Sequence, residues 1–289
     1  MMIKGTYKFY ANYRLVGQID NLILGAGLEL FGTTIHRNRC SLGNGLSPAE
    51  FTDTDLENEI IDSTVISGDF FWYDENPFRV THSMVYDFIV PPEGIKFTEA
   101  GIGAAGQLLS RARVSDANGF ETSIKINGDE TLRVVHSITY VPSVNDHVFT
   151  AYINGTNHVV TIRSCNLGSQ SVWRSVSGST WITNAVVYEN FELTPNTGSG
   201  NGSGDSAAVT GNSSDAKNGV LGPVYELKID VDQGDFVDGI GGAVINTGGA
   251  SIAGTSADGL NGRYQIKIDP PIRKTADERL TIILPLELI

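Results

Sequence analysis

Cysteine and positive charge are scarce in this chain of 289 residues. Its two cysteines, Cys40 and Cys165, lie far apart in the sequence and neither belongs to a C-x-x-C pair, so the sequence supports neither a disulfide framework nor a zinc knuckle. Only 20 lysines and arginines oppose 33 aspartates and glutamates, which leaves a formal net charge of −13. A surface of that sign repels nucleic acid and anionic membranes, so we expect neither as a partner.

Long apolar runs are also missing. The best candidate, residues 22–31, is interrupted by Gly25, Gly27 and Glu29, whereas a membrane-spanning helix needs about 20 apolar residues. Near the start of the chain, the charges of Lys4 and Lys8 lie within an alternating pattern and do not precede an apolar segment. We therefore expect no signal peptide, and folding in a cytoplasm.

The sequence contains none of the common catalytic motifs. No serine lies in a G-x-S-x-G motif, no glycine-rich segment leads into Gly-Lys-Ser/Thr, and the histidines form no H-E-x-x-H or H-x-x-x-H pair. The five histidines are His36, His82, His136, His147 and His158. We expect a protein that is not an enzyme and uses no cofactor, and we assign no catalytic, cofactor-binding or metal-binding residue.

Two acidic clusters are the candidates for a metal site. One alternates through Asp53, Asp55, Glu57 and Glu59, and the other consists of four aspartates around Gly234, at positions 230, 232, 235 and 238. Both are similar to oxygen-ligand calcium loops but lack the bidentate glutamate that completes the ligand pattern. A solvated acidic loop explains each more simply, and calcium binding stays an alternative. A polysaccharide hydrolase needs two carboxylates about 5 to 9.5 Å apart, a condition that 33 acidic residues meet too easily to identify a pair.

Apolar and polar residues alternate over much of the chain. Apolar residues occupy most odd positions from Ile3 to Leu15, and a longer alternation runs from Phe78 to Val90 before Pro91-Pro92. A period of two gives an extended strand two chemically different faces, and proline removes the hydrogen-bond donors that a strand needs. We predict a mainly β fold of antiparallel β-sandwich units with short helices.

Asparagine residues mark three predicted hairpin turns. One lies near Asn12, and two more lie at Asn118-Gly119 and Asn154-Gly155, because Asn-Gly tolerates positive φ. The turn at Asn118-Gly119 would join residues 108–114 to residues 122–126. Short helices are predicted within residues 21–31 and after Ser47-Pro48-Ala49-Glu50, which has the sequence of a capping box.

The chain divides into two predicted domains, residues 1–144 and 145–289. Each contains an Ile-Lys-Ile segment, at 124–126 and 266–268, followed by a polar turn with Asp-Glu and a returning apolar strand. This echo indicates two related β-domains, with chance similarity between short strands as the alternative. Residues 196–206 consist mostly of Gly, Ser and Asn. Since these side chains bury little apolar area, we predict a mobile loop there.

Four consecutive aromatic residues, Phe70-Phe71-Trp72-Tyr73, would place two rings on each face of a strand. Exposed aromatic rings such as these, Trp173 and Trp181 can stack on sugars. Packing in a core or against another subunit is the more common role of such a run. Glycan binding through Trp72 or Tyr73 is kept as the alternative.

Several segments resemble the structural proteins of tailed bacteriophages, which form tail, fibre or collar parts of the virion. The N-terminal hairpin sequence leads into Asn21-Leu22-Ile23 and then Gly25-Ala26-Gly27-Leu28, and residues 52–56 read Thr-Asp-Thr-Asp-Leu. Further similar segments are Thr98-Glu99-Ala100-Gly101, Ser110-Arg111-Ala112, Asp129-Glu130-Thr131-Leu132, Ile138 to Pro142 and Asp269-Pro270-Pro271-Ile272. These segments follow the same order as in that family.

The resemblance implies a β-rich virion component that assembles in several copies and has no established catalytic residues. The expected function is a non-enzymatic structural component of a tailed-phage virion, in the tail, collar, baseplate or fibre attachment. The expected partners are further copies of the chain and other virion proteins, and the expected location is the virion, assembled in the host cytoplasm. The alternative is a host-receptor or carbohydrate-binding module of the phage tail.

Overall fold

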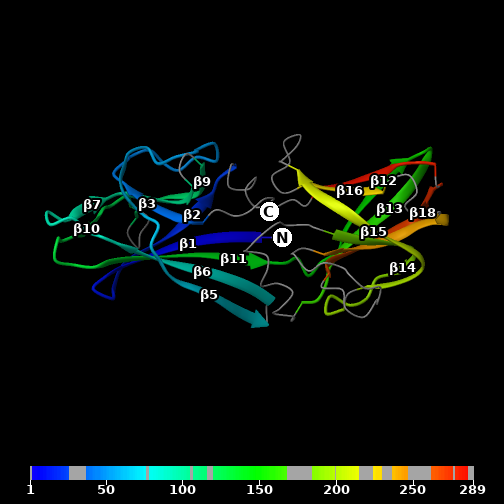
Figure 1. Ribbon diagram of the computed structural model, residues 1–289, viewed down its shortest axis with the longest axis horizontal. Coiled ribbons are helices and arrows are strands. Elements are labelled where there is room, and N and C mark those ends of the chain that lie inside the picture. Colours follow the sequence, from blue (N-terminus) through cyan, green and yellow to red (C-terminus); the bar gives the residue numbers. More distant parts are fainter. Residues whose placement is uncertain are drawn as a thin grey trace. The chain divides into compact units, whose positions relative to one another are not determined.

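The computed structural model describes residues 2–25, 37–75, 78–104, 107–115, 120–167, 184–198, 200–214, 224–229, 236–246, 262–275 and 277–285. These residues form strands β1 to β19, and the pairings of defined register are antiparallel (Figure 1). The predicted β fold is confirmed. Within the described part of the chain, no helix has the length and apolar character needed to cross a membrane.

The chain forms two compact units, which are described separately. The N-terminal unit comprises Met2–Tyr73 and Arg79–Val141, and the C-terminal unit comprises Pro142–Leu288. That residues 1–144 and 145–289 are domains able to fold independently stays a prediction.

The N-terminal unit contains a nine-stranded sheet in the order β4-β3-β8-β9-β2-β1-β11-β6-β5 and a two-stranded sheet of β10 and β7. Its strands are β1 (Met2–Ala11), β2 (Arg14–Ile23), β3 (Arg39–Gly43), β4 (Glu59–Ser63), β5 (Ile66–Glu75), β6 (Phe78–Phe88), β7 (Ile95–Phe97), β8 (Glu99–Ala104), β9 (Gln107–Arg113), β10 (Ile124–Ile126) and β11 (Leu132–Val141).

The large sheet changes direction at β2. Most of this strand pairs with β1, whereas its last residues, Leu22 and Ile23, pair with β9. The β8–β9 half therefore faces the β1–β11 half, and the phenol of Tyr7 on β1 lies 2.9 Å from the hydroxyl of Ser110 on β9. The core lies between the two halves.

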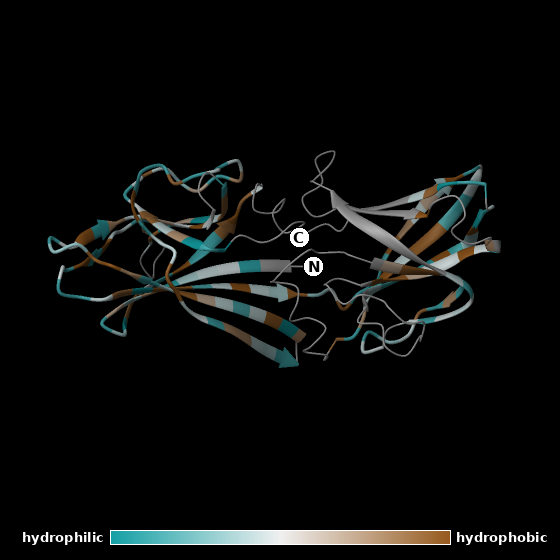
Figure 2. Ribbon diagram, viewed as in Figure 1, coloured by the Kyte–Doolittle hydropathy of each residue, from teal (hydrophilic) through white to brown (hydrophobic). Residues whose placement is uncertain are grey.

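Alternation along the strands decides which side chains enter this core. Along β11, Val134, His136, Ile138 and Tyr140 are fully buried, while the residues between them are half-buried on the outward face. Figure 2 shows the same alternation of hydrophilic and hydrophobic residues along the strands of this unit. The predicted strand from Phe78 to Val90 is confirmed as β6, which ends at Phe88, before the two prolines.

Two of the three predicted turns are confirmed. Asn12 and Tyr13 have φ of 47° and 64°, and Asn154 and Gly155 have φ of 49° and 82°, as turns between twisted antiparallel strands require. The third turn, Asn118-Gly119, lies outside the described residues. The residues beside it pair as predicted, because Ser115 and Glu121 form an antiparallel bridge and the amide of Thr122 donates to the carbonyl of Val114 at 3.0 Å. The rest of the predicted second arm differs, because residues 124–126 form β10 and pair with β7. That pairing buries both Ile124 and Ile126.

The predicted helix after Ser47 is also wrong. Residues 44–50 form an irregular loop, in which the carboxylate of Glu57 accepts hydrogen bonds from the amides of Leu46 and Ser47. Glu57 thus accepts the Ser47 amide that a capping box would assign to Glu50. In the other predicted helix, residues 21–23 belong to β2, and residues 26–31 lie outside the described residues.

The C-terminal unit contains an eight-stranded sheet in the order β12-β13-β18-β17-β14-β15-β16-β19. Its strands are β12 (His147–Ile153), β13 (Thr156–Ser164), β14 (Asn184–Glu192), β15 (Asn201–Ser214), β16 (Val224–Ile229), β17 (Phe236–Asn246), β18 (Gly262–Lys274) and β19 (Leu280–Pro285). As with β2, one long strand changes partners: β15 pairs with β14 through residues 201–210 and with β16 through residues 211–214.

The prediction of a mobile loop over residues 196–206 is wrong for its second half, which begins β15. Tyr188 on β14 is paired opposite Ser206, and Phe191 is paired opposite Gly202. A Cβ on Gly202 would lie 2.3 Å from the ring of Tyr188. The neighbouring strand supplies both the hydrogen bonds and the apolar cover that this segment lacks, so its composition did not reveal a strand.

Replacing Gly202 with valine is expected to destabilise the C-terminal unit by about 1–3 kcal/mol, because the added side chain displaces the ring of Tyr188 from a packed position. Urea unfolding of the two proteins measures the difference. Ser206→Val, on the same strand at an exposed position, is the matched control and should change stability little. Equal stability of Gly202→Val and the native chain would contradict this packing.

The sequence echo between the two halves extends to the turns. In the first, the amide of Asn127 donates to the carboxylate of Glu130 at 2.8 Å, and the amide of Glu130 donates to the carbonyl of Asn127 at 3.0 Å. Thr275 and Glu278 repeat both bonds, at 2.9 Å and 3.2 Å. The glutamate of each Asp-Glu pair therefore makes the same two bonds, one pair of bonds before β11 and the other before β19.

Candidate functional site

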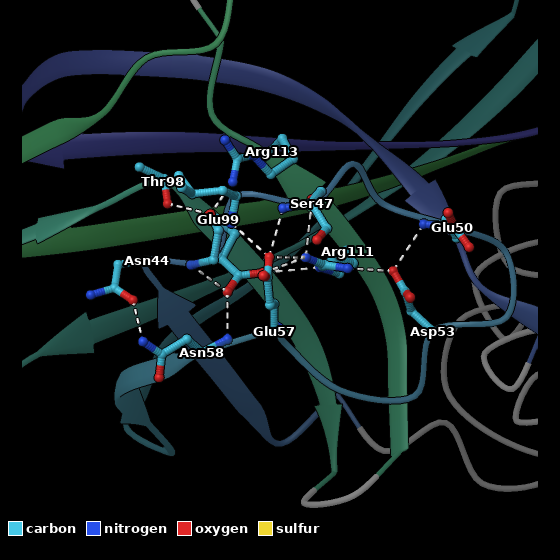
Figure 3. Close-up of polar contacts among 12 residues, drawn as sticks. Asn44, Ser47, Glu50, Asp53, Glu57, Asn58, Thr98, Glu99, Arg111 and Arg113 are labelled. Atoms are coloured by element: carbon cyan, nitrogen blue, oxygen red, sulfur yellow. Dashed lines mark hydrogen bonds and ion pairs between the residues drawn. The ribbon is translucent and has the colours of Figure 1, made fainter.

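One group of charged residues anchors the loops of the N-terminal unit to its sheet. Glu99, the first residue of β8, is fully buried, and its carboxylate accepts hydrogen bonds from Nε of Arg111 at 2.9 Å and from the amides of Gly45 and Asn58 at 2.9 Å and 3.0 Å (Figure 3). Arg111 comes from β9, the partner of β8. A Cβ on Gly45 would lie 2.4 Å from the Glu99 carboxylate, so glycine allows this close approach.

Arg111 also binds a carboxylate from the first acidic cluster. Its guanidinium contacts Asp53 at 2.6 Å, and the Asp53 carboxylate accepts a further hydrogen bond from the amide of Glu50 at 2.9 Å. Burial lowers the pKa of Arg111, but hydrogen bonds and charge from Asp53 and Glu99 outweigh it, so the net pKa is raised. This arginine stays charged at every physiological pH and does not transfer protons.

The four carboxylates of the first acidic cluster turn to different partners. Asp53 binds Arg111, Glu57 accepts from the loop amides of Leu46 and Ser47, Asp55 accepts from the Thr54 hydroxyl, and Glu59 pairs with Arg39. The Ser47 amide is the main reason why the pKa of Glu57 is lowered. In the described part of the chain, no three His, Cys, Asp or Glu side chains come together as metal ligands.

Of the second acidic cluster, only Asp238 belongs to the described residues. Asp230, Asp232 and Asp235 lie outside the described residues, and the amide of Asp238 donates to the carboxylate of Glu189 at 3.2 Å. Calcium binding at this cluster stays an alternative.

A second group of charged residues lies inside the N-terminal core. The guanidinium of Arg37, which is 3% exposed, donates to Nδ1 of His82 at 2.9 Å and to Nδ1 of His136 at 3.0 Å. His82 in turn contacts the Asp69 carboxylate through Nε2 at 2.5 Å. Because an arginine only donates, both Nδ1 atoms accept, and each neutral ring carries its proton on Nε2.

His136 is held in its neutral form. Burial, the charge of Arg37 and the proximity of His82 hold its pKa well below the ordinary value. Its Nε2 lies 3.3 Å from both the Ser110 hydroxyl and the amide group of Asn21. Turning that amide by 180° would place the otherwise unpaired oxygen of Asn21 against the Nε2 proton. His136 and His82 are thus buried structural groups, far apart in sequence and joined by the pairing of β6 with β11.

The aromatic run on β5 divides between the two faces of the sheet, as predicted. Phe71 is half-buried and stacks on His82, with ring centroids 4.2 Å apart and planes 7° apart. Phe70 and Trp72 are 48% and 52% exposed on the opposite face. Tyr73, the other residue named for glycan binding, is half-buried. Trp173 and Trp181 lie outside the described residues.

Strand β12 forms one edge of the C-terminal sheet, and its residues are exposed or half-buried. Val148 and Tyr152 are 57% and 72% exposed on its outward face, beside Val159 of the neighbouring strand β13, which is 46% exposed. The register pairs Thr150 with Val159, so the three apolar side chains lie together. We name Val148, Tyr152 and Val159 the β12 patch.

Both cysteines are buried thiols without a disulfide. Burial raises the pKa of Cys165 to about 12 and raises that of Cys40 as well, so neither is a thiolate at neutral pH. Of the other histidines, His147 is exposed, His158 donates through Nδ1 to the carbonyl of Pro270 at 2.6 Å, and His36 lies outside the described residues.

No structural role was predicted from the sequence for Arg37, Glu99 or Arg111. A usable signal existed for Arg111, because it stands in a run of otherwise small or apolar residues, Leu108 to Ala112. A charged residue inside a buried strand requires a partner. Nothing in the local sequence indicates that this partner is Glu99.

No family model matches this chain, and neither a curated protein nor a solved structure matches it significantly.

Proposed function

We propose that this chain is a non-enzymatic structural component of a tailed-phage virion, located in the tail, collar, baseplate or fibre attachment. It assembles with further copies of itself and docks to other virion proteins, in a particle formed in the host cytoplasm. The resemblance of its sequence motifs to such proteins supports the virion assignment. The β12 patch supports assembly as the mode of action.

The observation that carries assembly is a sheet edge, β12, that no other described strand covers and that bears apolar side chains. An edge strand presents unpaired backbone N–H and C=O groups that can pair with a strand of another chain. Natural edge strands are commonly protected by charge, proline or bulges, yet the seven residues of β12 include no lysine, proline or acidic residue. The exposed Val148 and Tyr152 would become buried when a partner strand extends the sheet.

The charged groups of the N-terminal unit support a structural role for that unit. Glu99 and Arg111 satisfy each other and the loop amides, and Arg37 is enclosed by two histidines. These groups fix loops to the sheet and are not directed at open space. A unit built in this way presents a rigid surface for docking.

Lysine substitutions in the β12 patch test the assembly. The native chain is expected to form an oligomer in size-exclusion chromatography with light scattering, and Val148→Lys with Tyr152→Lys is expected to shift it to monomers, because like charges would meet at the paired edges. Leu46→Lys, at an equally exposed apolar residue in a loop of the other unit, is the matched control and should leave the oligomer intact.

Two results would overturn the assembly. One is a native chain that stays monomeric at about 100 µM, far above the Kd of a stable interface, and that does not associate with other virion proteins. The other is an oligomer that the double lysine variant leaves unchanged while circular dichroism shows that the variant is folded.

A host-receptor or carbohydrate-binding module of the phage tail is the second candidate. The specific observation in its favour is the exposed pair Phe70 and Trp72, since large aromatic side chains exposed together are common in binding sites.

A further inference from the structure

A groove lies on the outward face of the N-terminal sheet, over β1, β11, β6 and β5. Its volume is about 450 Å³, within the range of pockets that hold small ligands. Aromatic side chains, hydroxyl groups and one ammonium group line it. The residues that matter here are Lys8, Tyr10, Phe70, Trp72, Thr81 and Ser137.

The aromatic wall comes from the edge strand β5. The ring centroids of Phe70 and Trp72 are 5.8 Å apart and their planes are inclined by 36°. About half of each side chain is exposed. The apolar C–H face of a sugar ring can stack on such rings and remove them from water, while the sugar hydroxyls stay available for hydrogen bonds.

The floor of the groove is rich in hydroxyl groups. Thr81 of β6 bonds to Thr139 of β11 at 2.9 Å, and Ser83 of β6 bonds to Ser137 of β11 at 2.5 Å. Each pair uses one hydroxyl hydrogen and leaves the other hydroxyl able to donate, with several lone pairs able to accept. A wholly apolar ligand would bury these groups without partners, at a cost. A polyhydroxylated ligand satisfies them.

Lys8 supplies the charge that lines the groove. It lies on β1 with Gln18 and Val135 as its partners in register, and within the described residues it forms no ion pair. In a chain of net charge −13, an ammonium group beside aromatic rings favours a ligand that carries a carboxylate. The same net charge disfavours a nucleic acid, whose stacked bases bring a phosphate with each nucleotide.

We propose that this groove binds an acidic oligosaccharide of the uronate class, with one sugar ring on Trp72 and Phe70, sugar hydroxyls at Thr81 and Ser137, and a carboxylate at Lys8. This inference goes beyond the proposed assembly role and uses a different unit from the β12 patch. It rests on the second candidate function and deepens it, because it assigns a ligand class to the face on which Trp72 is exposed.

The test uses tetrasaccharides of galacturonan, alginate and hyaluronan and their carboxyl-reduced, neutral forms. Isothermal titration with the full chain is expected to show binding of at least one acidic form. For that probe, Trp72→Ala is expected to weaken binding about tenfold or more, while Trp72→Phe retains most of the affinity. Lys8→Gln is expected to weaken binding of the acidic form about fivefold and to leave binding of the neutral form unchanged. The two forms should then bind the variant with equal affinity.

Phe120→Ala is the matched control, since Phe120 is an exposed aromatic residue that does not line the groove, and it should bind like the native chain. Absence of binding for every acidic probe at about 1 mM, or equal affinity of Trp72→Ala and Phe120→Ala, would refute the proposal. If the chain binds no sugar but Trp72→Ala changes its oligomeric state, the face is a subunit contact instead. The β12 double variant should bind sugar normally, which separates this proposal from the assembly.

Discussion

Replacing Glu99 with alanine is expected to destabilise the N-terminal unit by about 3–5 kcal/mol, the usual cost of breaking a buried ion pair by removing one partner. The carboxylate is fully buried and is bound by Arg111 and by the amides of Gly45 and Asn58. Its loss leaves three amides, those of Gly45, Glu57 and Asn58, without this acceptor. It also removes one of the carboxylates that compensate the charge of Arg111, whose side chain is 3% exposed. The loop between β3 and β4 should then detach from the sheet.

Hydrogen exchange measured by mass spectrometry shows which strands lose stability. Peptides from β3, β8 and β9 are expected to exchange faster in Glu99→Ala than in the native chain. If that variant fails to fold, Glu99→Gln, which keeps the volume and one acceptor oxygen, should give an intermediate loss of protection. Glu57→Ala removes a more exposed carboxylate from the same loop and should cost much less. Equal protection in Glu99→Ala and the native chain would show that this contact does not stabilise the sheet.

Acidification is expected to destabilise the N-terminal unit through His136. The pKa of this histidine is lowered in the folded chain, whereas in the unfolded chain it lies near the ordinary value of about 6.5. Below that pH the unfolded chain binds a proton at His136, whereas the folded chain does not. The contribution of His136 to the free energy of unfolding is therefore fully present above about pH 6.5. Below that pH it falls by about 1.4 kcal/mol per pH unit, until the pH reaches the lowered pKa of the folded chain.

Urea unfolding between about pH 5 and 7 measures this dependence and avoids the range near the ordinary pKa of aspartate, about 3.9. Asp87 and Asp146, whose pKa values are lowered mainly by hydrogen bonds from Arg133 and Arg163, lose their contributions in that lower range. His136→Gln should flatten the slope in the N-terminal unit. His147→Gln, at an exposed histidine, should leave it unchanged. An unchanged slope in His136→Gln would assign the effect to another group.

Strands and turns could be predicted from the sequence where their signals are local. Alternation placed Tyr7 and Phe9 in the core, and both are fully buried. Asn12 and Asn154-Gly155 marked turns, because their own backbone preferences decide the conformation. The sequence of β15 gave no such signal, because Tyr188 and Phe191 on the neighbouring strand cover it.

The candidate sites could not be predicted in the same way, because they are formed by contacts between residues that are distant in the sequence. The acidic run from Asp53 to Glu59 looked like a solvated loop with a calcium alternative, yet Asp53 pairs with Arg111, which is 58 positions away. The histidines looked scattered, although His82 and His136 both bind Arg37. The sequence shows which residues are charged. Which partner lies beside a buried charge depends on the order of the strands in the sheet.

Periodicity and turn chemistry therefore decide that this chain is a β protein, where several of its hairpins reverse, and which side of each strand is apolar, because those properties act over a few neighbouring residues. Tertiary structure decides that β2 and β15 each change partners along their length, that Glu99 and Arg111 meet, and that Phe70 and Trp72 face a hydroxyl-lined floor with Lys8. These features require pairings across many residues of chain, and no local pattern encodes which strands become neighbours.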